Sequence, residues 1–162
     1  MLNQVIIFCA QYLYIAIAGI ALLFWIFKES TIKRNILGIG IPSLVIAVAA
    51  DKILNLLIES PRPFLTEGVT PLFPHVTSNG FPSEHVLFAT LIAATIFIYN
   101  KKLGSFVMVL AIVVGAARVM ANVHHVMDVF GGLSIGIASV GIGCFIFSRY
   151  LQRLSFFTVR SK

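Results

Sequence analysis

The chain has 162 residues, of which 59% are hydrophobic and only 11% are charged, and its mean hydropathy is +0.98. A soluble domain carries about a quarter charged residues, so this composition excludes an ordinary soluble protein and indicates an integral membrane protein. One domain, residues 1–162, is expected from the length. The two cysteines, Cys9 and Cys144, are too few for a disulfide framework.

Five apolar stretches predict transmembrane helices. The first is an unbroken run over 5–27, long enough at about 1.5 Å per residue to cross a bilayer core of about 30 Å. No Lys or Arg precedes it and Lys28 follows it, which is the reverse of a signal peptide, so we expect a retained helix with its N-terminus outside. The other stretches cover 36–58, 83–99, 103–120 and 126–147. The sequence thus predicts an all-α bundle of about five transmembrane helices.

The segments between and within these helices have recognisable signals. Five of the six prolines lie in 60–82, so this segment is expected to be an irregular loop. Ser83, directly after Pro82, is a good N-cap for the third helix. Glycines in the fifth helix are expected to let neighbouring helices pack closely; they are Gly131, Gly132, Gly136, Gly141 and Gly143.

The positions of the charges give an orientation. With the N-terminus outside, segments 28–35, 100–102 and 148–162 lie inside, and they hold nine of the twelve Lys and Arg residues with a single acid. This obeys the positive-inside rule. It also accounts for the net charge of +6 without a nucleic-acid partner. The C-terminus is therefore expected inside.

The remaining basic residues, Lys52, Arg62 and Arg118, fall at the outer helix ends, as do all four histidines. Ionisable groups at membrane depth are costly and indicate function by default. Arg62 and Arg118 offer planar donor forks suited to phosphate oxygens, although either alone is compatible with snorkelling to the interface. The Ser83 hydroxyl and the first amides of the third helix add donors. Together they predict a pocket for a tetrahedral oxyanion.

His124 and Asp128 are spaced i, i+4, so they share a helix face if the fifth helix begins by His124. A carboxylate bonded to one ring nitrogen would fix the tautomer and leave the other nitrogen as a nucleophile. His125 would pair with Val129 instead, so the spacing selects His124. The alternative is that histidines at a helix end have no role.

Two further histidines need interpretation. His85 lies shortly after Ser83 in the third helix, and general acid is the role left for it. His75 lies in the proline-rich loop and is expected to be a loop residue or to line the path of the substrate. A zinc site made by His85, His124, His125 and Asp128 is an alternative, but two neighbouring arginines would repel a cation. We therefore expect no metal and no cofactor.

These residues resemble the type 2 phosphatidic acid phosphatase superfamily of membrane phosphatases. Its motifs are Lys-x6-Arg-Pro, Pro-Ser-Gly-His and Ser-Arg-x5-His-x3-Asp. The chain has Arg62-Pro63, then Pro82-Ser83-Glu84-His85, then Ala117-Arg118 followed by His124 and Asp128 at the same gaps. The match runs from about Lys52 to Gly132 in the family's order.

The chain departs from these motifs at three positions. Asn55 stands at the first-motif Lys position, with Lys52 one turn earlier and able either to reach the pocket or to pair with Asp51 or Glu59. Glu84 replaces Gly in the second motif, and Ala117 replaces Ser in the third. The first two departures resemble the bacterial undecaprenyl-diphosphate phosphatase branch. The chain is also shorter than the usual six-span form.

The resemblance implies metal-independent hydrolysis of a lipid phosphate. His124 would attack phosphorus to form a phosphohistidine, Asp128 would orient His124, and His85 would protonate the leaving oxygen and then activate water. The phosphoryl oxygens would be held by Arg62, Ser83 and Arg118, with Lys52 as a further candidate.

The implied substrate is undecaprenyl diphosphate, converted to undecaprenyl phosphate at the outer face of a bacterial cell membrane. The alternatives are a phosphatidate or phosphatidylglycerophosphate phosphatase, and a catalytically inactive protein that binds lipid phosphates. A small channel or transporter is a third class, but no pair of spans in related positions is unusually interrupted.

Overall fold

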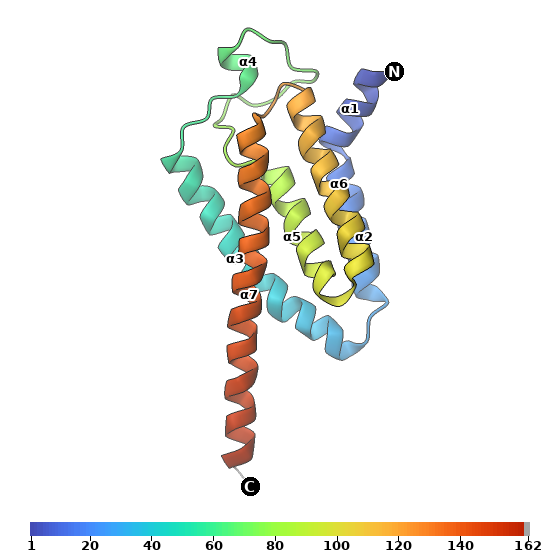
Figure 1. The fold of residues 1–162 in the computed structure, drawn as a ribbon, viewed down its shortest axis with the longest axis vertical. Helices are drawn as coiled ribbons and strands as arrows, with labels where there is room; N and C mark the ends of the chain where they lie inside the picture. The colour runs from blue at the N-terminus through green and yellow to red at the C-terminus, as the bar shows by residue number, and fades with distance from the viewer. Residues whose placement is uncertain (161–162) are drawn as a thin grey trace.

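Residues 1–160 are described by the computed structural model, with side chains as far as Leu151, and this part of the chain is helical with no β-strand. The helices are α1 (Leu2–Gln11), α2 (Leu13–Ile26), α3 (Ser30–Leu57), α4 (Pro63–Thr66), α5 (Glu84–Tyr99), α6 (Lys101–Met120) and α7 (Val126–Arg160). Helix α5 packs against α6 on one side and α7 on the other, and α3 crosses α7 (Figure 1). The N-terminus lies at the end of the bundle that carries α4, and the C-terminus lies at the opposite end.

The helices agree with the predicted all-α membrane bundle at the level of class. Three of them, α3, α6 and α7, are long and apolar enough to cross a membrane, and the pair α1 and α2 would make a fourth span. Helix α5 covers the third predicted span with 16 residues, about 24 Å at 1.5 Å per residue. The count of five spans and the orientation therefore stay predictions.

Three of the predicted spans differ from the observed helices. The first expected span is broken at Tyr12 into α1 and α2, which are bent by 48°. Helix α3 begins at Ser30 rather than at residue 36, because Lys33 and Arg34 in the expected connector are good helix formers. The last helix also continues past residue 147 to Arg160. The side chains of Arg153, Arg160 and Lys162, which we counted as inner charges, lie outside the described part.

The interior of the bundle is centred on α5. Val86, Ala89, Ala93 and Ile96 of this helix are buried with Ile17, Val107, Ala111 and Val114 of its neighbours. Large apolar side chains also cover the outside, where Phe106, Phe130 and Phe145 are each more than half exposed. A contiguous apolar exterior of this kind fits a surface in contact with lipid.

Glycines of α7 allow two close helix crossings. A Cβ added at Gly136 would lie 2.9 Å from the Thr90 Cβ of α5, and one at Gly132 would lie 2.8 Å from the Ser83 carbonyl oxygen. At Gly143 the added Cβ would meet the Ile39 carbonyl oxygen of α3 at 2.8 Å. A Cβ added at Gly141 would have no atom within 4 Å, so this glycine faces away from both crossings. The prediction that Gly141 allows close helix packing is therefore wrong.

The loop between α3 and α5 is held down by one asparagine side chain. The Asn79 amide donates to the backbone carbonyls of Asn55 and Ile58, both at 2.7 Å, and its oxygen accepts from the Ser60 amide at 2.8 Å. The Gly80 amide donates to the Ser60 carbonyl at 2.7 Å. The proline-rich segment is therefore tied to the end of α3, although it contains only the four-residue helix α4.

We predict that Gly136→Ala destabilises the protein by about 1–3 kcal/mol, because its methyl group would overlap Thr90 and the Leu87 carbonyl. Thermal unfolding in detergent measures this. Gly141→Ala is the matched control on the same helix and should leave the melting temperature unchanged or raise it slightly, since alanine is the better helix former. Equal melting temperatures for the two variants would contradict the assigned α5–α7 contact.

Candidate active site

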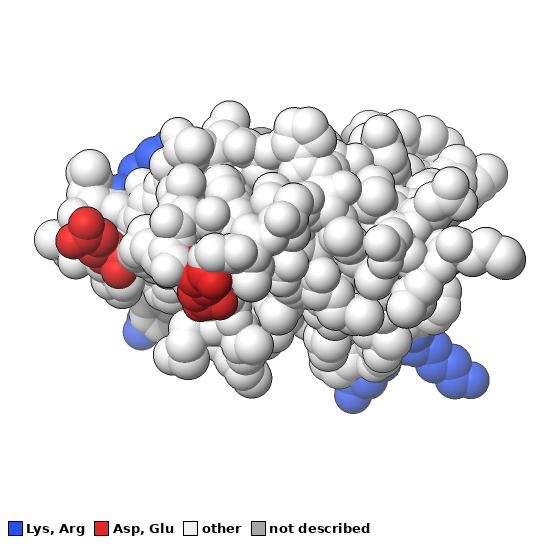
Figure 2. Space-filling view, turned by 90° about the horizontal axis from the view of Figure 1, so that it is seen from above, with Lys and Arg blue, Asp and Glu red and all other residues white. Residues whose placement is uncertain are grey.

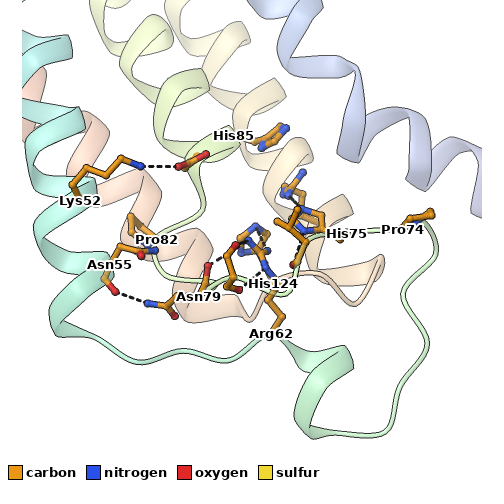
Figure 3. A pocket seen from close by; sticks show the side chains of 13 residues that line it. Lys52, Asn55, Arg62, Pro74, His75, Asn79, Pro82, His85 and His124 are labelled. Atoms are coloured by element: carbon orange, nitrogen blue, oxygen red, sulfur yellow. Dashed lines mark hydrogen bonds and ion pairs between the residues drawn. The ribbon is translucent and has the colours of Figure 1, made fainter.

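A cavity of about 480 Å³ opens at the end of the bundle where α3 ends and α5 begins (Figure 3). Four segments surround it: the end of α3, the α3–α5 loop, the start of α5, and the end of α6 with the connector to α7. The lining residues are Lys52, Asn55, Arg62, Pro74, His75, Val76, Ser78, Asn79, Pro82, Glu84, His85, Arg118 and His124. Five of the seven residues that the sequence singles out thus line one cavity, while Ser83 and Asp128 lie directly behind it.

His124 and Asp128 form a buried pair. The His124 Nδ1 lies 3.3 Å from the Asp128 Oδ2, and the two side chains are 3% and 0% exposed. Helix α7 begins only at Val126, so His124 precedes the helix and the two residues are not on one helical face as expected. The carboxylate instead reaches back from the first turn of α7 to the connector.

Asp128 is fixed by three donors. Its Oδ2 also accepts from the His125 backbone amide at 2.8 Å, and its Oδ1 accepts from the Ser60 hydroxyl at 2.9 Å. With Asp128 ionised, the His124 Nδ1 carries the hydrogen and Nε2 keeps its lone pair. This is the tautomer in which Nε2 can act as a nucleophile.

Arg62 provides independent support for this tautomer. Its NH1 group donates to the His124 Nε2 at 3.1 Å and to the Val123 carbonyl at 2.8 Å, while its Nε donates to the Ser78 carbonyl at 3.0 Å. A guanidinium has no acceptor, so Nε2 must be the unprotonated nitrogen. The Arg62 cation therefore lies next to the ring nitrogen that would react.

The neutral form of His124 is strongly favoured. Burial of the imidazole lowers the pKa of His124 to about 4. The hydrogen bond to Asp128 acts in the opposite direction, but the cations of Arg118 and Arg62 add to the lowering. The neutral imidazole is the form of histidine that can act as a nucleophile, and His124 is in this form at neutral pH.

Arg118 is held from both sides in the last turn of α6. It is 2% exposed; its NH1 donates to the Ala10 carbonyl at 3.0 Å, and its NH2 donates to the His75 Nε2 at 2.7 Å. Ala10 lies in the last turn of α1, where helix carbonyls lack an amide partner. The break between α1 and α2 therefore places a free carbonyl against Arg118, which apolar periodicity alone cannot reveal.

Ser83 occupies the N-cap position of α5, as the sequence predicts, but its hydroxyl makes no capping bond. The hydroxyl is buried and has no hydrogen-bond partner among the described residues. The Ser83 amide donates to the Asp128 carbonyl at 3.0 Å, which ties the start of α5 to α7. A buried hydroxyl that lies next to a cavity and has no hydrogen-bond partner is suited to donate a hydrogen bond to an oxygen of a bound ligand.

His85, in the first turn of α5, lines the cavity above His124 (Figure 3). Its ring packs edge-on against Tyr14 of α2, with centroids 4.6 Å apart. The imidazole is thereby held at the start of α5, across the cavity from Arg62.

The rim near α3 carries a small charge cluster. Lys52 lies 3.4 Å from Asp51 and 3.6 Å from Glu84, and its side chain is 69% exposed. The expected ion pair between Lys52 and Asp51 is therefore present. The second carboxylate near Lys52 is that of Glu84, not that of Glu59. The Asn55 amide donates to the Phe81 carbonyl at 2.8 Å and so supports the loop.

The positive charge of the site is buried rather than exposed at the loop end of the molecule. In the view onto the end of the bundle that carries the α3–α5 loop, acidic side chains are exposed, and Lys and Arg side chains (blue) appear only at the margins (Figure 2). Arg62 and Arg118 are 6% and 2% exposed. No carboxylate lies within 4 Å of either guanidinium in the part of the chain with described side chains. The two cations are therefore available to a bound anion.

His75 makes more contacts in the site than its place in the proline-rich loop indicates. It lines the cavity, contacts Arg118 and lies edge-on to His124 with centroids 6.2 Å apart. No motif includes His75, and its contact with Arg118 joins residues 43 positions apart.

The alternative zinc site is not formed by these residues. Within the described part of the chain, no three His, Cys, Asp or Glu side chains come together as a set of metal ligands.

Three comparisons relate the chain to known proteins. Residues 36–153 match the family model described as the PAP2 superfamily. The chain is 28% identical to undecaprenyl-diphosphatase BcrC of Bacillus subtilis over 93% of its own length and 77% of the relative's. It is 33% identical to the bacitracin transport permease protein BcrC of Bacillus licheniformis, over 86% and 68% of the two chains.

A solved structure has the same fold. The crystal structure of Aquifex aeolicus LpxE superposes with a TM-score of 0.74 at 25% identity, covering 88% of this chain and 85% of the other. The family match covers well over half of the chain and includes every motif residue. The protein is therefore a multi-pass membrane protein that belongs to the PAP2 superfamily of lipid phosphatases, as its motifs predict.

Proposed function

We propose that the protein hydrolyses a lipid phosphate or diphosphate without a metal ion, through a phosphohistidine on His124. The observation that carries this proposal is the orientation of the His124 ring: Nδ1 faces Asp128, and Nε2 faces the cavity beside Arg62. The family match and the relatives named as phosphatases support the reaction class.

The reaction takes two displacements. In the first, the His124 Nε2 attacks the terminal phosphorus, the bond between this phosphorus and the oxygen that stays on the lipid (or, in a diphosphate, on the lipid monophosphate) breaks, and protonated His85 gives its proton to that leaving oxygen. In the second, His85 removes a proton from water, the water oxygen attacks phosphorus, and the phosphorus–nitrogen bond breaks to release inorganic phosphate. Asp128 stabilises the positive ring that exists between the two steps.

The phosphoryl oxygens are held by the buried donors around the cavity. Arg62 and Arg118 supply charge, and the free Ser83 hydroxyl supplies a neutral donor. The lone pair of the His124 Nε2 must be free to attack phosphorus. The Arg62 NH1 group therefore has to move its hydrogen bond from this nitrogen to a phosphoryl oxygen. Donors that gain strength as charge develops on these oxygens favour the transition state.

The substrate we propose is undecaprenyl diphosphate, on the basis of the relative named undecaprenyl-diphosphatase. Lys52, at the exposed rim of the same cavity, is placed to contact a second phosphate if it leaves Asp51 and Glu84. The positive-inside distribution of charge supports a cavity that faces the outside of the cell.

We predict that purified protein in detergent releases phosphate from undecaprenyl diphosphate in the presence of a chelator, and faster than from phosphatidate or phosphatidylglycerophosphate. His124→Ala should abolish release, since the nucleophile is lost. Faster hydrolysis of the glycerolipids would overturn the proposed substrate. Dependence on added zinc would overturn the metal-free mechanism, and binding of lipid phosphate without any release would indicate an inactive binder.

Asp128→Asn should lower kcat by about two to four orders of magnitude with the fold intact, because an amide no longer fixes the His124 tautomer. Glu67→Gln is the matched control: this exposed carboxylate contacts His125, at 3.0 Å, rather than the nucleophile. It should keep near-parental kcat. If both variants keep parental activity, Asp128 has no part in the mechanism.

The low pKa of His124 gives a test that does not depend on turnover. Because the pKa is lowered from 6.5 to about 4, the ring stays neutral as pH falls from 8 to 5 and becomes charged only below that range. Nitrogen NMR of histidine-labelled protein in detergent measures this, with His124→Gln to assign the signal. A titration midpoint between pH 6 and 7 would contradict the assigned environment.

A further inference from the structure

His75 stands between the main cavity and a smaller one. The second cavity, of about 280 Å³, is lined by Gln11, Tyr12, Phe73, Pro74, His75, His85 and Arg118. Four residues, Pro74, His75, His85 and Arg118, line both cavities. The contact between His75 and Arg118 therefore forms part of the wall that closes the main cavity toward the α1–α2 break.

Both ring nitrogens of His75 are engaged. Nε2 accepts from the Arg118 NH2 at 2.7 Å, so Nδ1 carries the hydrogen, and it lies 3.3 Å from the Val76 carbonyl. Burial, together with the Arg62 and Arg118 cations, lowers the pKa of His75 and keeps the ring neutral. With no free nitrogen facing the cavity, His75 is not placed to carry a proton for the reaction.

A neutral acceptor has a specific advantage beside Arg118. A buried guanidinium needs acceptors for its N–H groups, and one donor is already taken by the Ala10 carbonyl. A carboxylate in the place of His75 would satisfy a second donor but would also neutralise the charge. The imidazole fixes the plane of the guanidinium and leaves its full positive charge for the phosphoryl group.

The hydrogen bond does not use up the donors of Arg118. The NH2 group has a second hydrogen, and Nε has no partner among the described residues. Arg118 can thus remain bonded to Ala10 and His75 while it binds a phosphoryl oxygen. This differs from Arg62, whose NH1 lies on the nucleophile and has to shift.

We propose that His75 is a positioning residue of the phosphatase site, which holds Arg118 through its Nε2 lone pair in the orientation that binds the phosphoryl group. The proposal rests on the proposed function, and it extends the site to a loop residue outside the three motifs. His75 acts on binding more than on the chemical step, because the bond to Arg118 is present before the reaction starts.

The test compares His75→Leu with His75→Gln in the full-length protein. Leucine removes the acceptor, and we expect KM for undecaprenyl diphosphate to rise about tenfold, the effect of losing one hydrogen bond to a charged group, with a smaller change in kcat. Glutamine can place an amide oxygen near the position of Nε2 and should restore KM to within about threefold of the parent. Thr77→Leu, an exposed position in the same loop, is the control and should leave KM unchanged.

A second readout separates this inference from the proposed function. Orthovanadate, which resembles a phosphoryl group, should raise the melting temperature of the parent and of His75→Gln, and raise it less for His75→Leu. If the parent releases no phosphate from any lipid, the proposed function fails and the vanadate shifts alone decide the role of His75.

Parental KM and a parental vanadate shift in a folded His75→Leu variant would overturn the positioning role. A His75→Gln variant as impaired as His75→Leu would also overturn it, since the acceptor would then not be what matters. If His75→Leu does not fold, His75→Asn replaces it, because its shorter amide cannot reach Arg118, and the same outcomes apply.

Discussion

The site depends on the burial of two arginine side chains that have no carboxylate within 4 Å among the residues whose side chains are described. Moving a charged group out of water is costly unless its donors find acceptors. Arg62 and Arg118 find them in backbone carbonyls, from Ser78, Val123 and Ala10, and in two imidazoles. Because all these acceptors are neutral, the hydrogen bonds do not neutralise either cation, and a bound phosphate group would supply the opposite charge.

This requirement for acceptors explains irregular features of the fold. Helix α1 ends at Gln11 and so presents the Ala10 carbonyl to Arg118. The α3–α5 loop follows no regular structure beyond α4, yet it is fixed by Asn79 and supplies the carbonyl that Arg62 needs. The glycines of α7 bring α5 close enough for the Ser83 amide to reach the Asp128 carbonyl. The regular helices therefore serve mainly to bring these irregular ends together.

Much of this arrangement could be predicted from the sequence. Hydropathy predicted the all-helical membrane class, although three helices, or four with the bent pair α1 and α2, are long and apolar enough to span rather than five. The three motifs together predicted the family and the residues that line the cavity or lie just behind it. The pairing of His124 with Asp128 was right, but its helical geometry was not, because a polar connector keeps His124 outside α7.

What the sequence could not give are contacts between distant segments. The break at Tyr12 leaves the Ala10 carbonyl at the end of α1 for an arginine that lies 108 positions later in the chain. His75 has no motif, and its role is visible only once the loop folds over Arg118. Gly141 and Gly143 have the same sequence signal, yet only Gly143 faces a neighbouring helix. Local sequence patterns indicate the periodicity of a helix and the spacing of its residues. They do not indicate which face of the helix contacts which neighbouring segment.

The central claim is that His124 becomes covalently phosphorylated, and trapping the intermediate tests it most directly. The parent protein, which keeps His85 for the first step, is mixed with lipid diphosphate labelled at the terminal phosphate and quenched in base within the first turnover, because phosphohistidine is stable in base. The account predicts label on the peptide that contains His124, and none when His124→Ala is added to the same protein. Label on another residue, or phosphate release by His124→Ala, would contradict it.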